Sequence, residues 1–321
     1  MSVPLVTWIM PVLNGMPFLP AALESLSKQT FQDHQVYVWD NGSTDGSLEV
    51  LREWIPARLP GKMFAGEPLS LGLSLKRLLE KAPSPLIGRM DADDLCLPHR
   101  LETQVACLEK HPELAVIGSE RISIDLDGRE IPRRSLFPSD YFDILHATLR
   151  APRVLHPSVL MRRDEVLGIG GYQDLSTPES PYWCEDYDLW LRVLSRHKVA
   201  ALSEPLIRYR YNPHSLTETE MRLNRSSDAK RRAWMLNRKA FAGIQKDAVA
   251  ARLWDRHLFL AMPVILGIAR YFEARDGLAV GERLKMPSFV RIAQSYLRRE
   301  DLISRVWLRG LSRKMEKDNN E

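Results

Sequence analysis

The sequence has few cysteines and no pattern among them. It contains three, Cys96, Cys107 and Cys184, in a chain of 321 residues. An odd number without the paired spacing of disulfide frameworks or zinc sites predicts a reducing compartment. The longest apolar run, Leu258 to Ala269, is shorter than the roughly 18 to 20 residues that cross a bilayer. The first residues lack a basic segment before an apolar core, so we expect no signal peptide. These absences predict a cytoplasmic protein that is soluble or peripheral on the inner face of the plasma membrane.

Two common nucleotide-binding motifs are also missing. The first strand-like segment leads into Pro11-Val12-Leu13-Asn14-Gly15-Met16, which is neither the G-x-G-x-x-G of dinucleotide-binding dehydrogenases nor a P-loop. This loop has no Lys or Arg to hold a triphosphate, which disfavours a sugar-phosphate nucleotidyltransferase. That enzyme class stays open as an alternative, as does a non-catalytic scaffold that binds a nucleotide-sugar.

Positive charge is concentrated at the C-terminal end. Residues 220–321 hold 22 Lys and Arg against 12 Asp and Glu, whereas residues 1–219 hold 23 against 29. Residues 289–321 combine basic and aromatic side chains in an amphipathic pattern, which is typical of a helix on an anionic membrane surface. The alternative is a helix packed on the catalytic domain. We expect no nucleic acid partner, because no recognised nucleic-acid module accompanies the basic run.

The first 120 residues alternate between strand and helix patterns. Apolar and β-branched runs predict strands, and apolar residues at helical spacing predict the helices between them. The strands expected are 5–11, 35–39, 86–90 and 115–118, and the helices are 18–28, 47–54, 71–81 and 98–110. Such crossovers suit parallel strands, so this part is predicted to be an α/β doubly wound half-sheet.

The pattern changes after residue 120. Two strands are expected at 122–126 and 130–132, because Asp127-Gly128 between them is a strong hairpin signal. A helix over 141–149, a strand-like stretch over 154–161, an acidic helix start at Glu185 and strands over 199–202 and 206–211 follow. From residue 220 onward only helices are expected. We therefore predict one domain over 1–219, with halves 1–120 and 121–219, and a basic all-helical extension over 220–321.

The most informative stretch is Arg89-Met90-Asp91-Ala92-Asp93-Asp94. It puts three carboxylates within four residues between an expected strand and the next helix. These carboxylates repel one another unless a cation lies between them, and Mg²⁺ or Mn²⁺ with a bound phosphate prefers such oxygen ligands. The alternative is that Asp93 or Asp94 only caps the following helix.

Three predicted strands deliver polar or turn residues to one edge of the sheet. Pro11, Asp40 and Asp91 each stand at the carboxyl end of a strand. In open α/β sheets ligands bind at this edge. Because Asp40 begins the run Asp-Asn-Gly-Ser-Thr-Asp, and an acidic triplet lies on the same edge, we predict a nucleotide site.

Several segments together carry a family resemblance. In order they are Pro11-Val12-x-Asn14, Ser25-Leu26-x-x-Gln29-Thr30, Asp40 to Asp45, Arg89 to Asp94, Pro98-His99-Arg100-Leu101 and Glu185 to Trp190. The chain from residue 3 to about 215 thereby resembles glycosyltransferase family 2, whose members have the GT-A fold. The fold class implied is a Rossmann-like mixed sheet flanked by helices.

The resemblance implies an inverting transfer from a nucleotide-sugar, most often a UDP-sugar, to a hydroxyl of a glycan or lipid-linked acceptor in cell-surface polysaccharide synthesis. It implies a Mn²⁺ or Mg²⁺ ion, because a cation neutralises charge on the leaving diphosphate. The donor residues implied are Pro11, Val12, Asn14, Asp40, Asn41, Arg89, Asp91 and Ala92. The metal ligands implied are Asp93, Asp91 and His214. Inversion in one displacement needs one base, which would be Asp186, with Glu185 orienting the acceptor or the base.

The sequence departs from the family pattern in three places, one of which is a loose match over residues 66–81, where Lys76 and Arg77 are the candidate phosphate contacts. Asn41 stands where a second aspartate often follows Asp40. The arginine-x-histidine that often ends the last strand is replaced by Arg210-Tyr211-Asn212, with His214 two residues later. Which of Asn212 and His214 would approach the metal therefore stays open. His156, before a proline, is expected to be a structural hydrogen-bonding residue, and the alternative is that it lies near the acceptor.

Overall fold

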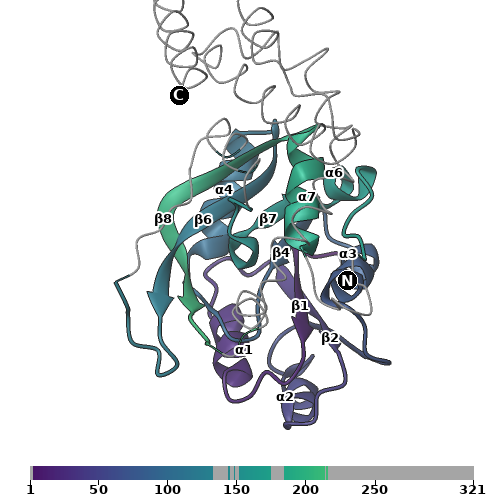
Figure 1. Cartoon of the computed structure of the whole chain (residues 1–321), viewed down its shortest axis with the longest axis vertical. Coiled ribbons are helices and arrows are strands. Elements are labelled where there is room, and N and C mark those ends of the chain that lie inside the picture. Colours follow the sequence, from purple (N-terminus) through teal and green to yellow (C-terminus); the bar gives the residue numbers. More distant parts are fainter. Residues whose placement is uncertain are drawn as a thin grey trace, which may run out of the picture. The chain divides into compact units, whose positions relative to one another are not determined.

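The computed structural model describes residues 3–132, 144, 148, 152–174, 184–213 and 215 (Figure 1). Within them the strands form one eight-stranded mixed sheet, in the order β3-β2-β1-β4-β7-β6-β8-β5. The predicted mixed α/β architecture is confirmed. The extension expected over 220–321 lies outside the described residues.

The half of the sheet with parallel strands is built around β1. Strand β1 (Val6–Val12) pairs with β2 (His34–Asp40) and β4 (Leu86–Arg89), and β2 pairs with β3 (Gly61–Ala65). The alternate residues Val6, Trp8, Met10 and Val12 of β1 are all buried in one core cluster that also takes in side chains of the flanking helices. Strands that are covered on both faces have nearly continuous apolar sequences, which is why these strands could be predicted from the sequence.

The helices of this half connect the parallel strands, as predicted. They are α1 (Leu19–Ser27), α2 (Ser47–Trp54) and α3 (Leu71–Lys81). Helix α1 buries the predicted apolar stripe, Leu19, Ala22, Leu23 and Leu26. Because β1 runs parallel to both β2 and β4, the carboxyl ends of these three strands lie at one edge of the sheet.

The other half of the sheet contains both strand directions. Strand β7 (Leu160–Arg162) lies antiparallel to β4 and to β6 (Leu114–Ile124), whereas β8 (Lys198–Arg210) runs parallel to β6 and antiparallel to the short β5 (Leu95–Cys96). Close packing at the junction requires Gly88 in β4, because a Cβ there would lie 2.5 Å from the ring of Trp8.

Four further helical segments complete the described part. They are α4 (Arg100–Lys110), the 3₁₀ turn η1 (His156–Ser158), α6 (Arg163–Gly168) and α7 (Glu185–Leu194). Figure 1 shows α7 beside α6, near the β4–β7 junction. Most of the helix expected over 141–149 lies outside the described residues.

Some element boundaries predicted from sequence were wrong. The segments 115–118 and 122–126 were expected as separate strands, but β6 runs unbroken from Leu114 to Ile124. The segments 199–202 and 206–211 likewise belong to one strand, β8, which continues through Pro205. Register shifts near Ser119 and Glu120 accommodate the irregularity between these two paired strands. The expected boundary at residue 120 therefore falls inside a strand.

The hairpin signal at Asp127-Gly128 is confirmed. Gly128 has a φ of 82°, and its N–H donates to the carbonyl oxygen of Asp125 at 3.1 Å. Ile124 and Glu130 form a bridge beyond the turn. Arg210 donates hydrogen bonds both to this hairpin (125–129) and to the carbonyl oxygen of Asp93.

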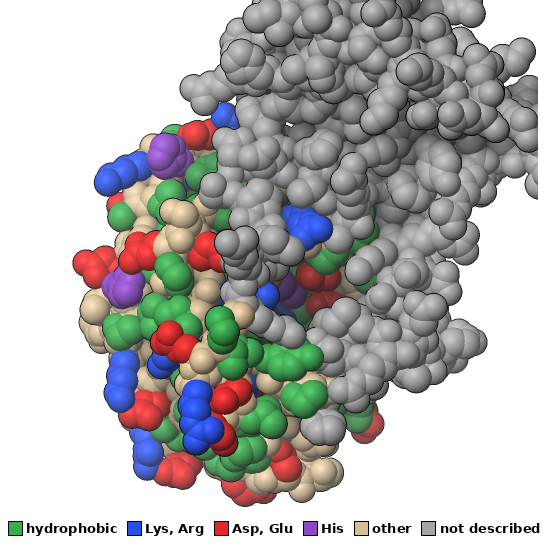
Figure 2. Space-filling view, turned by 60° about the vertical axis from the view of Figure 1, so that its left-hand side comes forward, with side chains coloured by type: hydrophobic (Ala, Val, Ile, Leu, Met, Phe, Trp, Pro, Cys, Tyr) green, Lys and Arg blue, Asp and Glu red, His purple; other side chains and the backbone are tan. Residues whose placement is uncertain are grey.

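Within the described residues, no helix is both long enough and apolar enough to cross a bilayer. On the face shown in Figure 2, acidic and basic side chains are interspersed over the coloured surface. The basic segment 289–321, proposed from sequence as a membrane contact, lies outside the described residues.

Candidate active site

Two loops at the carboxyl edge are joined by hydrogen bonds. The backbone N–H of Asn14 donates to Ser43 Oγ at 2.9 Å, and Thr44 N–H donates to Asn14 Oδ1 at 2.9 Å. Met16 N–H donates to Asp45 Oδ2 at 2.8 Å. Asn14 has a φ of 51°, a left-handed conformation that asparagine tolerates better than most residues. Asn14 therefore shapes the loop after β1 and fixes it to the loop after β2.

Asp40 ends β2 and is almost fully buried, with 2% of its surface exposed. Its Oδ2 accepts hydrogen bonds from the backbone N–H groups of Gly42, at 3.2 Å, and Ser43, at 3.3 Å. Its Oδ1 is buried and has no hydrogen-bond partner among the described residues. Burying an acceptor oxygen without a hydrogen-bond donor costs free energy. A ligand that donates a hydrogen bond to Asp40 Oδ1 would remove this cost. Pro11 and Val12 lie beside it, with Val12 in register with Asp40.

Asn41 has a distinct task. Its side-chain N–H donates to the carbonyl oxygen of Leu69 at 2.5 Å, and Leu69 N–H donates to Asn41 Oδ1 at 2.6 Å. The amide thus pairs with both backbone groups of one residue just before α3. A carboxylate could accept the second bond but not donate the first. This pairing gives a physical reason for asparagine at a position where an aspartate was anticipated.

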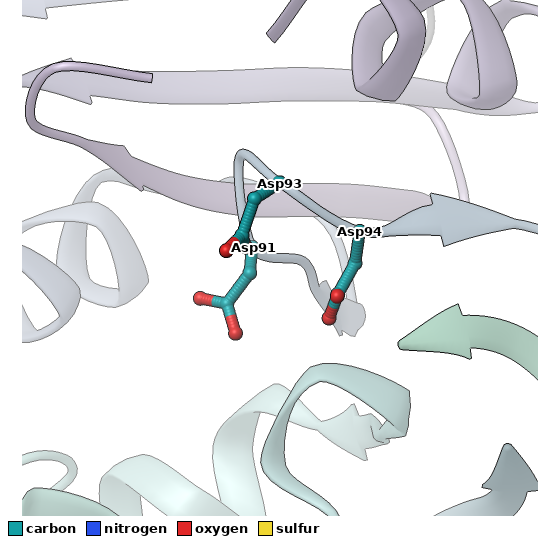
Figure 3. Close-up of side chains that lie close together, drawn as sticks. All are labelled: Asp91, Asp93 and Asp94. Atoms are coloured by element: carbon teal, nitrogen blue, oxygen red, sulfur yellow. The ribbon is translucent and has the colours of Figure 1, made fainter. Parts of the chain in front are cut away.

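The acidic turn after β4 brings its three carboxylates together. One oxygen from each of Asp91, Asp93 and Asp94 lies within 4.8 Å of the others, and Figure 3 shows the side chains leaving the same turn. Burial and the charge of Asp91 raise the pKa of Asp93 to about 6. Burial and then the charges of Asp93 and Asp91 raise the pKa of Asp94 well above its ordinary value. The turn concentrates more negative charge than its surroundings stabilise, which favours a bound cation.

Asp94 is not a helix cap. It is buried, and its Oδ1 accepts a hydrogen bond from the backbone N–H of Arg210 at 2.7 Å. Its Oδ2 is buried without a partner among the described residues. The alternative reading of Asp94 as a cap for the next helix is therefore wrong, because its carboxylate faces β8.

Two buried arginines contact the acidic turn or the strand that precedes it. Arg89 is buried and forms an ion pair with Asp91 through Nη1. Arg100 is fully buried, and its Nη2 donates to the carbonyl oxygens of Arg89, at 3.0 Å, and Val159, at 3.2 Å. Ala92 packs close to the loop after β1, since a Cβ on Gly15 would lie 3.4 Å from that of Ala92. The acidic turn therefore lies next to the loop after β1, which is itself hydrogen-bonded to the loop that follows Asp40.

The second acidic group lies in the first turn of α7. Glu185 is buried, and burial together with the charge of Asp186 raises the pKa of Glu185 to about 8. Asp186 is half-buried, and its Oδ1 accepts the backbone N–H of Tyr187 at 2.7 Å. Asp188, by contrast, is paired with Arg192 in the same helix. Glu185 and Asp186 are the two first-turn acids for which a role at the site was predicted.

The two acidic groups act on each other electrostatically. The charges of Arg89 and Asp91 both affect the pKa of Glu185, the first lowering it and the second raising it. Glu185 also lies beside His156, whose Nδ1 is 3.7 Å from Glu185 Oε1. The other ring nitrogen of His156 hydrogen-bonds to the hydroxyl of Tyr172 at 2.7 Å. These contacts link Glu185 to the residues around the acidic turn, and His156 is buried and hydrogen-bonded, as was expected of it.

Some predicted or relevant residues need separate mention. His214 lies outside the described residues, and Asn212 is half-buried within them. Sequence reasoning assigned no role to Arg100, Arg210 or Tyr172, although each contacts the site or its support. Arg100 did stand in a segment that carries the family resemblance, Arg210 in one that departs from it, and Tyr172 follows two glycines, but none of these signals assigned a role to the side chain.

Comparison with known proteins agrees with this arrangement. The sequence profile of "Glycosyl transferase family 2" matches residues 7–168. The amylovoran biosynthesis glycosyltransferase AmsE of Erwinia amylovora is 35% identical over 195 residues, which cover 60% of this chain and 70% of AmsE. The putative glycosyltransferase EpsE of Bacillus subtilis is 31% identical over 193 residues, covering 60% of this chain and 67% of EpsE.

Solved structures show the same fold at low sequence identity. S. aureus TarS, in complex with UDP-GlcNAc, has a TM-score of 0.61 and 17% identity, covering 89% of this chain and 78% of that one. The mannosyltransferase PcManGT from Pyrobaculum calidifontis, in complex with GDP-Man and Mn²⁺, has a TM-score of 0.52 and 19% identity, covering 96% and 84%. The fold is that of the GT-A enzymes. Together with the matched profile and relatives, this shows that the chain is a glycosyltransferase and belongs to family 2.

Proposed function

We propose that this enzyme transfers a sugar from a UDP-sugar to an acceptor hydroxyl, with inversion and with a divalent cation. The observation that carries the proposal is the cluster of Asp91, Asp93 and Asp94, within 4.8 Å of one another, at the same sheet edge as Asp40. Asp40 offers a carboxylate oxygen to the base of a nucleotide, and the three other carboxylates offer ligands to a divalent cation. A cation bound to the diphosphate of that nucleotide would balance their negative charge.

Asp40 would recognise the base. Its unpartnered Oδ1 can accept the imide N–H of uracil, while Pro11 and Val12 form the adjacent strand end. The solved relative TarS is described with UDP and UDP-GlcNAc, which supports uridine as the first base to test. PcManGT is described with GDP-Man, and guanine also offers a ring N–H, so GDP is the second.

Asp93 and Asp91 would hold the cation, with Asp94 close by. The donor set suits Mg²⁺ or Mn²⁺ because it consists of carboxylate oxygens. The buried Asp94 Oδ2 and the raised pKa of Asp93 show that these groups are poorly stabilised as the chain stands. When bound, the cation would neutralise charge that develops on the diphosphate as the sugar leaves. Arg89, paired with Asp91, keeps that carboxylate oriented.

Asp186 would accept the proton of the acceptor hydroxyl. It is more exposed than Glu185, so an acceptor can reach it. Because the pKa of Glu185 is about 8, Glu185 is mostly protonated at pH 7 and can act as a neutral hydrogen-bond donor toward Asp186 or the acceptor. One ionised and one protonated carboxyl side by side divide the tasks of base and orienting group.

The acceptor and the place of action are inferred from relatives. AmsE is described as an amylovoran biosynthesis enzyme, and WbnJ of Escherichia coli, 25% identical over 222 residues, as an O-antigen biosynthesis glycosyltransferase. We infer a glycan or lipid-linked acceptor in cell-surface polysaccharide synthesis at the cytoplasmic face, with residues 289–321 on the anionic membrane surface. Deleting residues 289–321 should move the protein from the membrane to the soluble fraction, and unchanged fractionation would contradict this contact.

A donor-cleavage assay tests the chemistry. Wild-type protein is incubated with UDP-sugars and Mn²⁺, and released UDP is measured with and without candidate glycan acceptors. We expect release that EDTA abolishes and that Asp186→Asn lowers by about 10²-fold or more, the scale of general base catalysis. Asp188→Asn is the matched control, since Asp188 lies in the same helix turn but pairs with Arg192. Equal activity of Asp186→Asn and wild type would refute the assignment of the base.

A further inference from the structure

Arg210, at the end of β8, is a buried arginine whose hydrogen bonds go to backbone carbonyls. Its Nε donates to the carbonyl oxygen of Asp93 at 2.8 Å. Its Nη1 donates to the carbonyl oxygens of Asp125, at 2.8 Å, and Leu126, at 2.9 Å. One guanidinium therefore joins the acidic turn to the 125–129 hairpin, two segments about thirty residues apart in sequence.

Two more contacts of Arg210 concern the same region. Its backbone N–H donates to Asp94 Oδ1 at 2.7 Å, and its guanidinium carbon lies 4.4 Å from the centroid of the Phe18 ring. Phe18 stands at the start of α1, at the end of the loop after β1. Three loops at the site edge thus meet at one side chain.

We propose that Arg210 is a positioning residue for the cation site, which holds Asp93 and Asp94 in place by fixing their turn to the hairpin and to β8. The inference rests on the proposed binding of a divalent cation by the acidic turn. Arg210 acts through the backbone of Asp93, so it need not touch the ion. Residues that orient metal ligands in this way typically change metal affinity by about 10- to 100-fold when replaced.

The geometry requires arginine and not only a positive charge. Carbonyl oxygens from two segments are reached by Nε and Nη1, which lie at fixed angles in one planar group. A lysine ammonium at the end of a flexible chain could satisfy one of these segments but not hold both at once. Arg210→Lys therefore keeps the charge and removes the clamp.

Arg208 provides a matched control. It lies two residues earlier on β8, on the same face of the strand, and its guanidinium pairs with Glu130, the residue that follows the hairpin. Among the described residues this side chain pairs with Glu130 and not with the acidic turn, and it is about one-third exposed. Arg208→Met thus removes an arginine contact next to the hairpin and leaves the hydrogen bonds of the acidic turn in place.

The test is calorimetric titration of Mn²⁺ into the full-length protein with saturating UDP, together with the melting temperature in EDTA. We expect Arg210→Lys and Arg210→Met to bind Mn²⁺ about 10- to 100-fold more weakly, and Arg208→Met to stay within about twofold of wild type. Folded Arg210 variants with unchanged Mn²⁺ affinity would overturn the inference. A wild type that binds UDP without any dependence on Mn²⁺ would instead overturn the proposed cation site.

A milder variant covers the case in which both Arg210 variants fail to fold. Phe18→Leu removes the ring next to the guanidinium and leaves every hydrogen-bond acceptor of Arg210 in place. We expect a several-fold loss of Mn²⁺ affinity with little change of the melting temperature in EDTA. Wild-type affinity in folded Phe18→Leu protein would count against Arg210 as a positioning residue.

Discussion

The family pattern and the local structure give opposite expectations for the substitution Asn41→Asp. Family resemblance alone suggests that aspartate is acceptable here. The structure predicts a loss, because the side-chain N–H that donates to the Leu69 carbonyl oxygen at 2.5 Å disappears, and a carboxylate oxygen takes its place. The bond from Leu69 N–H to Oδ1, at 2.6 Å, can survive. In the variant, a carboxylate oxygen of residue 41 would therefore face the carbonyl oxygen of Leu69 with no hydrogen between them.

The expected size follows from this single lost bond. Leaving a buried acceptor without a donor costs about 1–3 kcal/mol. Because this hydrogen bond is only partly buried, we expect the lower part of that range, about 1–2 kcal/mol at pH 7.5. Asn41→Ala removes both bonds without adding a charge, so its loss of stability should not depend on the ionisation of residue 41.

The pH dependence provides the signature. A protonated carboxyl at position 41 could donate to the Leu69 carbonyl oxygen, so the folded state would raise its pKa above the unfolded value of about 3.9. A raised pKa contributes stability at low pH that is lost as the pH rises through the folded value. Urea unfolding of Asn41→Asp, Asn41→Ala and wild type at pH 5 and 7.5 should show a smaller deficit for aspartate at pH 5. Wild-type stability of Asn41→Asp at pH 7.5 would refute the reasoning.

Three further predictions concern the packing and charge of the site. Gly72→Ala should lower stability by about 1–3 kcal/mol in urea unfolding, because its Cβ would lie 2.5 Å from the Gln173 carbonyl oxygen; an unchanged midpoint would contradict it. Tyr172→Phe should cost about 1–3 kcal/mol, since it leaves a buried nitrogen of His156 unpaired; wild-type stability would count against that bond. Mn²⁺ should raise the melting temperature more at pH 7.5 than at pH 5.5, because Asp93, with a pKa of about 6, must ionise to bind; equal shifts would exclude Asp93 as a ligand.

The parts of the fold that were predictable share a strong local signal. Strands β1 and β2 are mostly buried and apolar, and α3 was predicted with the bounds it has, Leu71–Lys81. Strand β3 was missed because Gly61–Ala65 is a short, partly exposed edge strand whose sequence does not alternate. Strand β5 has only two residues, and its pairing with β8 depends on a chain segment about a hundred residues away.

The candidate site was predictable where strand ends deliver acids. Asp40 and Asp91 follow strands, so their meeting at one edge follows from topology. The roles of Arg100 and Arg210 were not predictable, because their acceptors are backbone carbonyls of distant segments, such as Val159 and Asp125. Any residue supplies a carbonyl, so no side-chain pattern marks such partners. Arginines of this kind become recognisable only when the fold is known.

The central claim is that the acidic turn binds a cation together with a nucleoside diphosphate. It is tested most directly by calorimetric titration of UDP into wild type and Asp93→Asn, with Mn²⁺ and with EDTA. The account predicts UDP binding to wild type that depends on Mn²⁺ and is weakened at least tenfold by Asp93→Asn. Equal binding of UDP to both proteins, with and without Mn²⁺, would contradict it.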